Sequence, residues 1–287
     1  MTLLARIALS LAFIMPLVAT TLPAQAEERW QTLPDYPPMP EPVDSRIADV
    51  NGIRLHFAIY GAGDPVILLL HGGLGHSDVW GFQIPALAER YRVITVDSRG
   101  HGRSTRNEAP YSYDLMADDV LALLNWLEIP KASILGWSDG GIVGLDIAMR
   151  HPERLEKLFA FGANYSVSGV KTGVEDDPVF GAYIERSAKD YERLSPTPDD
   201  FKGFVDAVVE MWMTQPEYSA AQLGSIRTPT VIADGEHDEA IKPQHTKEMA
   251  SLIPGADLVI FPKGSHFAFL QDPEAFNKAV LTFLEAE

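Results

Sequence analysis

The sequence predicts an α/β protein in which a mostly parallel sheet carries helices on both faces and a small helical cap. Three observations predict it: short apolar runs end in glycine-rich or polar turns, helical stretches lie between them, and one helical insertion interrupts the alternation. Apolar runs bounded by turns are typical of strands buried on both faces of a parallel sheet. Their alternation with helices favours a doubly wound sheet.

The expected strands and helices follow one another from residue 46. The segment IRLHFAIYG has the alternating pattern of a strand, and continuous apolar runs follow in PVILLLHGG, YRVITVDSRG, ASILGWSDGG, LEKLFAFGAN, TPTVIADGEHD and ADLVIFPKGSH. Helical patterns occupy residues 114–128, 140–150, 244–252 and 273–285. These segments together predict the alternating core of the domain.

The helical insertion spans residues 167 to about 223 and contains no apolar run of the strand type. Its segments DPVFGAYIERSAKDYERL and DDFKGFVDAVVEMWMTQ are amphipathic, and they lie between the fourth and fifth parallel strands counted from PVILLLHGG. We expect a helical cap over the carboxyl ends of the strands, where open α/β sheets bind ligands.

The amino-terminal part of the chain is expected to lie outside the folded domain. Residues 1–26 carry one charge, Arg6, and an apolar run well short of the roughly 20 residues that a membrane span needs. They are expected to be a secretory signal peptide cleaved after Ala26, which implies an exported protein, periplasmic or secreted. Residues 27–45 carry five prolines and are expected to form a tether or a surface strap, which leaves residues 46–287 as the domain.

The composition excludes several classes of function. The formal net charge of −17 repels nucleic acid and anionic lipid, so a small-molecule substrate is the partner we expect. The chain has no cysteine, which excludes disulfides, a thiol nucleophile and a thiolate metal site. Its histidines show no metal-binding spacing such as H-E-x-x-H, so neither a metal nor a cofactor is predicted. The sequence predicts no oligomeric state.

The strongest motif is the G-x-S-x-G pattern that surrounds Ser138. It lies between an expected strand and an expected helix, which is the context of a nucleophile elbow. Gly136 and Gly140 remove side chains that would collide with the strand and the helix in so tight a turn. We therefore expect the hydroxyl to stand at the carboxyl edge of the sheet. The alternative is a serine that only caps the helix.

A serine hydroxyl needs a base at neutral pH, and in this arrangement the acid and the histidine follow the serine in the chain. The segment VIADGEHDEAI offers Asp234, Glu236, His237 and Asp238, and for the acid we favour Asp238 because it lies in the loop rather than in the last turn of the strand. His266, in the loop after the next strand, is the expected base. His245 falls on an expected helix and is expected at the surface.

An oxyanion hole is expected beside the serine. One backbone N–H should come from Asp139, the residue after the nucleophile, and another from the HGGLG segment, most simply from Gly73 with Leu74 close behind. Trp137 and Asp139 flank the serine and are expected to contact the substrate.

The segment DSRGHGRS, residues 97–104, resembles a phosphate-binding loop only superficially. It lacks the G-x-x-x-x-G-K-[ST] spacing, and no helix is expected directly after it. We expect Asp97, Arg99, His101 and Ser104 to form a buried polar turn that supports the site, and His71 to brace the HGGLG loop.

Taken together, HGG, DSRGHGRS, GWSDGG, GEHD and GSH resemble the motifs of the α/β-hydrolase superfamily, in the same order, across residues 46–286. The segments GWSDGGIVGLDIAMRHPERLEKLFAFGANY and ERLSPTPDDFKGFVDAVVEMW are similar to the valacyclovir-hydrolase group, also called biphenyl-hydrolase-like. The resemblance implies an α/β-hydrolase fold and hydrolysis of esters by a serine without a cofactor. It also implies that Asp139 receives the α-ammonium of an amino-acid ester. Otherwise Asp139 is expected to face solvent or a neighbouring arginine.

The sequence therefore predicts a hydrolase of small carboxylic esters that uses Ser138, Asp238 and His266. The same three residues would serve for a lactone, an amide or a carbon–carbon bond next to a ketone. A ligand-binding homologue without turnover is the alternative from another class.

Overall fold

A computed structural model describes residues 28–286 of the chain, so the expected signal peptide over residues 1–26 lies outside the described part. The sheet has the strand order β1-β2-β4-β3-β5-β6-β7-β8. The strands are β1 (Asp44–Val50), β2 (Ile53–Tyr60), β3 (Val66–Leu70), β4 (Arg92–Val96), β5 (Ala132–Trp137), β6 (Leu155–Phe161), β7 (Thr230–Gly235) and β8 (Asp257–Phe261). From β4 to β8 all neighbours are parallel, which confirms the predicted fold class.

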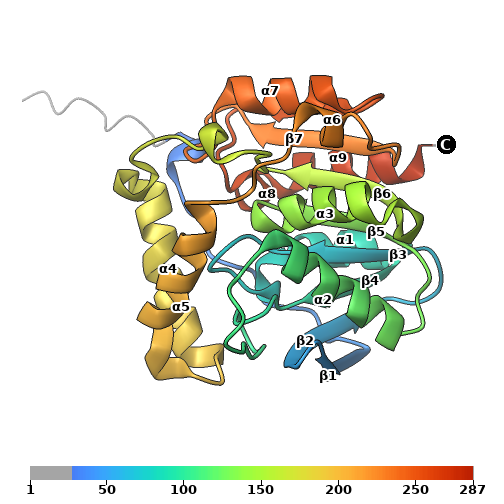
Figure 1. The fold of residues 1–287 in the computed structure, drawn as a ribbon, viewed down its shortest axis with the longest axis vertical. Coiled ribbons are helices and arrows are strands. Elements are labelled where there is room, and N and C mark those ends of the chain that lie inside the picture. Colours follow the sequence, from blue (N-terminus) through green and yellow to red (C-terminus); the bar gives the residue numbers. More distant parts are fainter. Residues whose placement is uncertain (1–27, 287) are drawn as a thin grey trace, which may run out of the picture.

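The sheet is covered on both faces by helices (Figure 1). α1 (Gln83–Ala88) and α9 (Pro273–Glu285) pack against each other and against the sheet. α3 (Asp139–Arg150) packs on β5 and β6, and α2 (Tyr113–Trp126) packs against α3 and β1. α7 (Pro243–Leu252) contacts β7, and the short α8 (Ala268–Gln271) precedes α9. The helices expected from the sequence therefore form, with ends shifted by one or two residues.

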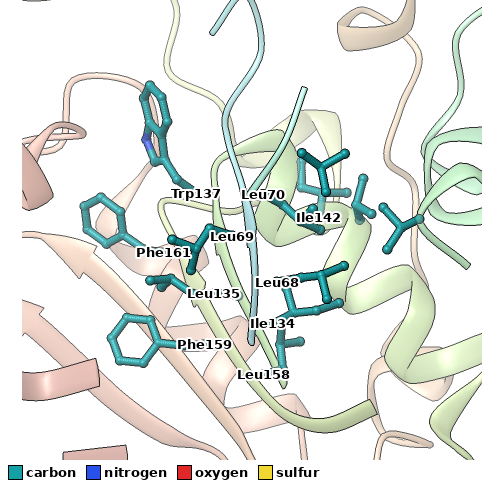
Figure 2. Close-up of a cluster of buried hydrophobic side chains, with 14 of the residues drawn as sticks. Leu68, Leu69, Leu70, Ile134, Leu135, Trp137, Ile142, Leu158, Phe159 and Phe161 are labelled. Atoms are coloured by element: carbon teal, nitrogen blue, oxygen red, sulfur yellow. The ribbon is translucent and has the colours of Figure 1, made fainter. Parts of the chain in front are cut away.

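The central strands are apolar throughout because both of their faces are buried. Figure 2 shows Leu69, Leu135 and Phe159 on one side of the sheet and Leu68 and Ile134 on the other. All five side chains are almost fully buried. This explains why the sequence shows continuous apolar runs here rather than alternation.

The first strand was not predicted, and it begins inside the segment expected to be a strap. β1 pairs antiparallel with β2 at the edge of the sheet, and only Ala48 and Val50 among its residues are buried. The other residues of DSRIADV face solvent or are half-buried. A short edge strand of this kind carries no apolar run, so periodicity gives no signal for it.

The insertion between β6 and β7 holds α4 (Pro178–Leu194), α5 (Phe201–Trp212) and the short α6 (Ala220–Leu223). Figure 1 shows α4 and α5 side by side at one end of the sheet. Phe204, Val208 and Met211 are the buried residues of α5, so its apolar face is turned inward. The arrangement is that of a helical cap.

The segment before β1 joins the cap to the core. Arg186 on α4 donates to the carbonyl oxygens of Leu33 (3.0 Å) and Pro34 (2.7 Å). Gln271 at the end of α8 donates to the carbonyl oxygen of Thr32 at 2.7 Å. We call residues 28–43 the strap. It is fastened to two elements that are far apart in the sequence.

Candidate active site

Ser138 lies at the turn from β5 into α3, in a backbone conformation that few residues adopt. Its φ is 53° and its ψ −119°. A Cβ on Gly136 would lie 2.3 Å from the carbonyl oxygen of Gly140, and a Cβ on Gly140 would lie 2.1 Å from that of Leu70. Both glycines are therefore required by close backbone approaches. The turn presents the half-buried serine at the carboxyl end of the central strand.

His266 and Asp238 form a buried hydrogen-bonded pair. His266 Nδ1 lies 2.6 Å from Asp238 Oδ2, and both side chains are at most 3% exposed. Asp238 Oδ1 accepts hydrogen bonds from the N–H groups of Ala240 and Ile241, both at 2.6 Å. These bonds fix the carboxylate, and the carboxylate in turn fixes the imidazole.

The charges of this pair stabilise each other. Burial lowers the pKa of His266, but the Asp238 carboxylate, together with Glu239 and Asp139, raises it, and the net shift of the His266 pKa is upward. Burial raises the pKa of Asp238, but His266, together with hydrogen bonds from Asp234 and the Ile241 N–H, lowers it, and the net shift of the Asp238 pKa is downward. Because Nδ1 donates to the carboxylate, Nε2 of the neutral ring is left as an acceptor.

The imidazole lies over the end of β6, next to the serine turn. A Cβ on Gly162 would lie 2.8 Å from Cε1 of His266. Gly162 follows Phe161, whose carbonyl oxygen accepts the N–H of Ser138 at 2.8 Å. The three residues expected to act together are thus gathered at the carboxyl ends of β5, β7 and β8. Among the described residues Ser138 Oγ forms no hydrogen bond, and such contacts often tighten only when substrate binds.

The other candidates in the acid loop have different surroundings. Asp234 is buried and accepts a hydrogen bond from Thr246 at 2.5 Å, and burial together with Asp238 raises its pKa well above the ordinary value. Glu236 is exposed. Neither of these carboxyl groups is hydrogen-bonded to His266.

His245 is buried, so its expected place at the surface was wrong. Its ring stacks on Tyr165 with centroids 4.1 Å apart, and its Nε2 accepts the N–H of Tyr165 at 3.0 Å. The helical pattern gave no sign of this because the contact comes from the loop after β6.

Glu239 was missed by the sequence analysis. Its Oε2 accepts the backbone N–H of His266 at 2.9 Å, and burial, the largest influence, raises its pKa to about 7. On the other side of the loop, Gln271 Oε1 accepts the N–H of Ser265 at 2.8 Å. The histidine loop is therefore held by an acid on one side and by the end of α8 on the other. The only feature of the sequence that could have pointed to Glu239 is that it directly follows the candidate acid in GEHDEA.

The HGGLG loop lies directly below the cap. A Cβ on Gly73 would lie 2.2 Å from Cζ2 of Trp212 and 2.6 Å from Oδ2 of Asp139. Leu74 has a φ of 62°. The N–H groups of Gly73 and Leu74 donate to no other described residue, and the N–H of Asp139 opens α3, where helical N–H groups lack partners. These are the three donors expected from the sequence.

Asp139 faces neither solvent nor an arginine. It is 3% exposed, and its carboxylate accepts hydrogen bonds from Tyr113 Oη at 2.9 Å and from Trp212 Nε1 at 2.9 and 3.0 Å. Burial raises its pKa, and the two donors oppose that shift. The charge is thus met by neutral groups, one from α2 and one from the cap.

Trp137 contributes an apolar wall. It is 1% exposed, and its ring packs against Tyr183, His266, Phe267 and Phe269 with centroids 4.8 to 5.7 Å apart. Its ring holds the base in place from the side of the core.

The segment 97–104 forms the buried polar turn that was expected. Asp97, Arg99, His101 and Ser104 are all at most 1% exposed. His71 Nδ1 lies 2.7 Å from the Gly72 carbonyl oxygen, and burial lowers the pKa of His71 to about 4. The neutral ring braces the loop, as expected.

A cleft of about 650 Å³ is lined by residues 106–111 and by residues of α5 and the loops beside it, and Ser138, Asp238 and His266 are not part of its lining. Within residues 28–286 no cluster of histidine and acidic residues could hold a metal ion. No helix of this part of the chain is long and apolar enough to cross a membrane.

Comparisons with known proteins fit this arrangement. The model of the alpha/beta hydrolase fold family matches residues 65–195 and 212–273. The human serine hydrolase BPHL is 31% identical over 258 residues, which cover 85% of this chain and 87% of that protein.

Solved structures of hydrolases also match the fold of this chain. The enol-lactonase from Burkholderia xenovorans matches with a TM-score of 0.67 and 27% identity, over 84% of this chain and all of that one. A meta-cleavage product hydrolase from Pseudomonas fluorescens matches with a TM-score of 0.71 and 25% identity, over 85% of this chain and 97% of that one.

Proposed function

Because the chain belongs to the alpha/beta hydrolase fold family, we propose that it hydrolyses a small carboxylic ester through Ser138, His266 and Asp238. Its membership confirms the resemblance predicted from the sequence. The observation that carries the proposal is the buried Asp238–His266 pair, whose ring lies over Gly162 beside the strained serine turn. The serine hydrolase BPHL among its relatives supports it further.

The reaction follows the roles that the geometry allows. Ser138 Oγ adds to the ester carbonyl carbon while its proton passes to Nε2 of His266. The tetrahedral intermediate collapses, and His266 returns the proton to the departing alcohol. Water then attacks the acyl-enzyme with His266 again as base, and the acid is released. Asp238 keeps the proton of the resting imidazole on Nδ1 and stabilises the imidazolium of each step.

The oxyanion of each intermediate is held by backbone N–H groups. The free donors of Gly73, Leu74 and Asp139 lie around the serine turn, and peptide donors cost no reorganisation as charge develops. Trp137 excludes water from the side of the base.

The Ser138→Ala variant tests this assignment. Hydrolysis of p-nitrophenyl acetate should show a burst in the wild-type protein, and the variant should lose several orders of magnitude of turnover. A variant of unchanged thermal stability that retains turnover within tenfold of wild type would refute the triad.

For the substrate, we propose an ester that carries a free amine, with Asp139 as its acceptor. A carboxylate offers about four acceptor positions, and of the hydrogen bonds from Tyr113 and Trp212 only one reaches Oδ2. An ammonium there would meet a buried charge that now has only neutral partners. The wild type should prefer a free-amine ester over its N-acetylated form, and Asp139→Asn should remove the preference. Equal rates in the wild type would exclude this role.

A second candidate function is hydrolysis of a lactone, favoured by the likeness to an enol-lactonase. The same groups would open a ring ester, and the product would stay in one piece. Parallel assays of an ester and a lactone with similar acyl parts distinguish the two functions, because the preferred substrate class should give the larger kcat/KM.

We also propose that the protein is exported after cleavage behind Ala26. Sequencing the amino terminus of the protein isolated from its native host tests this, and an intact Met1 would exclude it.

A further inference from the structure

The two long helices of the cap, α4 and α5, each contact one residue of the proposed oxyanion hole. Tyr183 on α4 donates its hydroxyl to the Gly73 carbonyl oxygen at 2.8 Å. Trp212 on α5 donates Nε1 to the Asp139 carboxylate. The cap thus contacts the backbone of Gly73 and the side chain of Asp139 from two separate helices.

The cap helices pack closely against the HGGLG loop at both contacts. A Cβ on Gly73 would lie 2.2 Å from the Trp212 ring, and a Cβ on Gly75 would lie 2.9 Å from the Tyr183 hydroxyl oxygen. Tyr183 is 2% exposed, and burial raises its pKa well above the ordinary value, so it acts as a neutral donor. Any shift of α4 or α5 is passed to the loop directly.

Two consecutive peptide units of the HGGLG loop have different partners. The Gly72–Gly73 unit is held by the core, and the Gly73–Leu74 unit is held by the cap. The Gly72 carbonyl oxygen accepts from His71 at 2.7 Å and from the Gly75 N–H at 3.1 Å, both within the core. The N–H of Gly73 belongs to that same peptide unit, so the core sets its direction.

The next peptide unit is held by the cap instead. It joins the Gly73 carbonyl to the Leu74 N–H, and these two groups point in opposite directions because the unit is planar and trans. Within the described residues the side chain that holds this carbonyl is Tyr183. A hydrogen bond to the carbonyl also polarises the unit and makes its N–H a better donor.

We propose that Tyr183 and Trp212 are positioning residues that complete the oxyanion hole when the cap is closed, Tyr183 by aiming the Leu74 N–H and Trp212 by fixing Asp139. This inference rests on the proposed function. It makes the cap a part of the catalytic apparatus. Without the Tyr183 bond the Leu74 N–H would lose its fixed direction, and without Trp212 the Asp139 carboxylate would lose its cap partner, while the triad stayed intact.

The test uses Tyr183→Phe and Trp212→Phe in the full-length protein, with Tyr191→Phe as matched control. Tyr191 lies on the same helix as Tyr183, and its hydroxyl bonds only to Thr197 within the cap. With p-nitrophenyl acetate, which carries no amine for Asp139 to bind, each test variant should lower kcat about 10- to 100-fold and leave KM within threefold, because the lost contact counts mainly in the transition state. The control should keep the wild-type kcat.

A trifluoromethyl ketone, which forms a tetrahedral adduct with a serine, distinguishes positioning from simple loss of stability. Its affinity should fall in parallel with kcat/KM in both test variants, while the affinity for the product acid stays unchanged. In the double variant the fold-loss of kcat/KM should be smaller than the product of the two single fold-losses, because both substitutions disrupt the same oxyanion hole.

The outcomes separate the two proposals. If Ser138→Ala abolishes turnover but Tyr183→Phe and Trp212→Phe keep kcat and inhibitor affinity within twofold, the positioning role is wrong and the proposed function stands. If the test variants change only the melting temperature or only KM, the positioning role is also wrong. If Ser138→Ala retains turnover, the proposed function fails and the inference fails with it.

Discussion

Replacing Gly140 by alanine should displace the nucleophile without touching any group that reacts. The new Cβ would lie 2.1 Å from the Leu70 carbonyl oxygen, which is about 1.3 Å short of an ordinary 3.4 Å contact. The obstacle is backbone of a central strand, so α3 and the serine turn at its start must move. A misplacement of about 1 Å can cost a factor of about 100 in rate, so we expect kcat/KM to fall about 100-fold.

Gly144→Ala is the matched control. It adds the same methyl group to the same buried helix, but its Cβ would meet the end of the Leu158 side chain at 2.4 Å rather than backbone. It should lose some stability through overpacking and keep kcat/KM within threefold.

The assay is hydrolysis of p-nitrophenyl acetate, normalised by titration of the reactive serine with a fluorophosphonate. Melting temperatures of both variants show whether the protein is folded at the assay temperature. If folded Gly140→Ala keeps the wild-type rate, the close approach of α3 to β3 does not position the serine.

Three further predictions concern the acid, the base and the buried ion pair. Asp238→Asn keeps an acceptor for the Ala240 and Ile241 N–H groups but loses the tautomer control, so kcat should fall about 10⁴-fold, and a loss below tenfold in steady-state kinetics would exclude the role. Neutral His266 is the active form and its pKa is raised, so the acid limb of kcat/KM should lie above about pH 6.5. Removing the charge in Glu239→Gln should move that limb to lower pH, while the exposed Glu236→Gln should leave it in place. Asp119→Ala removes two 2.7 Å hydrogen bonds from Arg99 and leaves its buried guanidinium without a carboxylate partner. It should lower the free energy of unfolding, measured with urea, by about 3–5 kcal/mol. The control Asp118→Ala, at an exposed position, should lower it by less than about 1 kcal/mol.

The parts of the fold that bury apolar surface were predictable from the sequence. Strands such as Val66–Leu70 are apolar at every position because both faces of the sheet are covered. The edge strand Asp44–Val50 was missed for the opposite reason, since most of its residues are exposed or half-buried and carry no pattern.

The same contrast holds at the candidate site. Ser138 was found because a strained turn between two close backbones demands glycines at fixed spacing. Tyr183 and Trp212 were not found because their contacts join residues 110 and 73 positions apart, and cap packing alone decides them. Nothing local distinguishes them from other aromatic residues of amphipathic helices.

The strap has a consequence for recombination between members of the family. Its carbonyl oxygens are held by Arg186 of α4 and by Gln271, and Gln271 also holds the N–H of Ser265 beside the proposed base. An exchange of residues 162–229 alone would leave those acceptors facing a foreign helix. A chimera that imports another cap should therefore work best when residues 28–43 of the same donor come with it, although they lie more than 100 residues upstream.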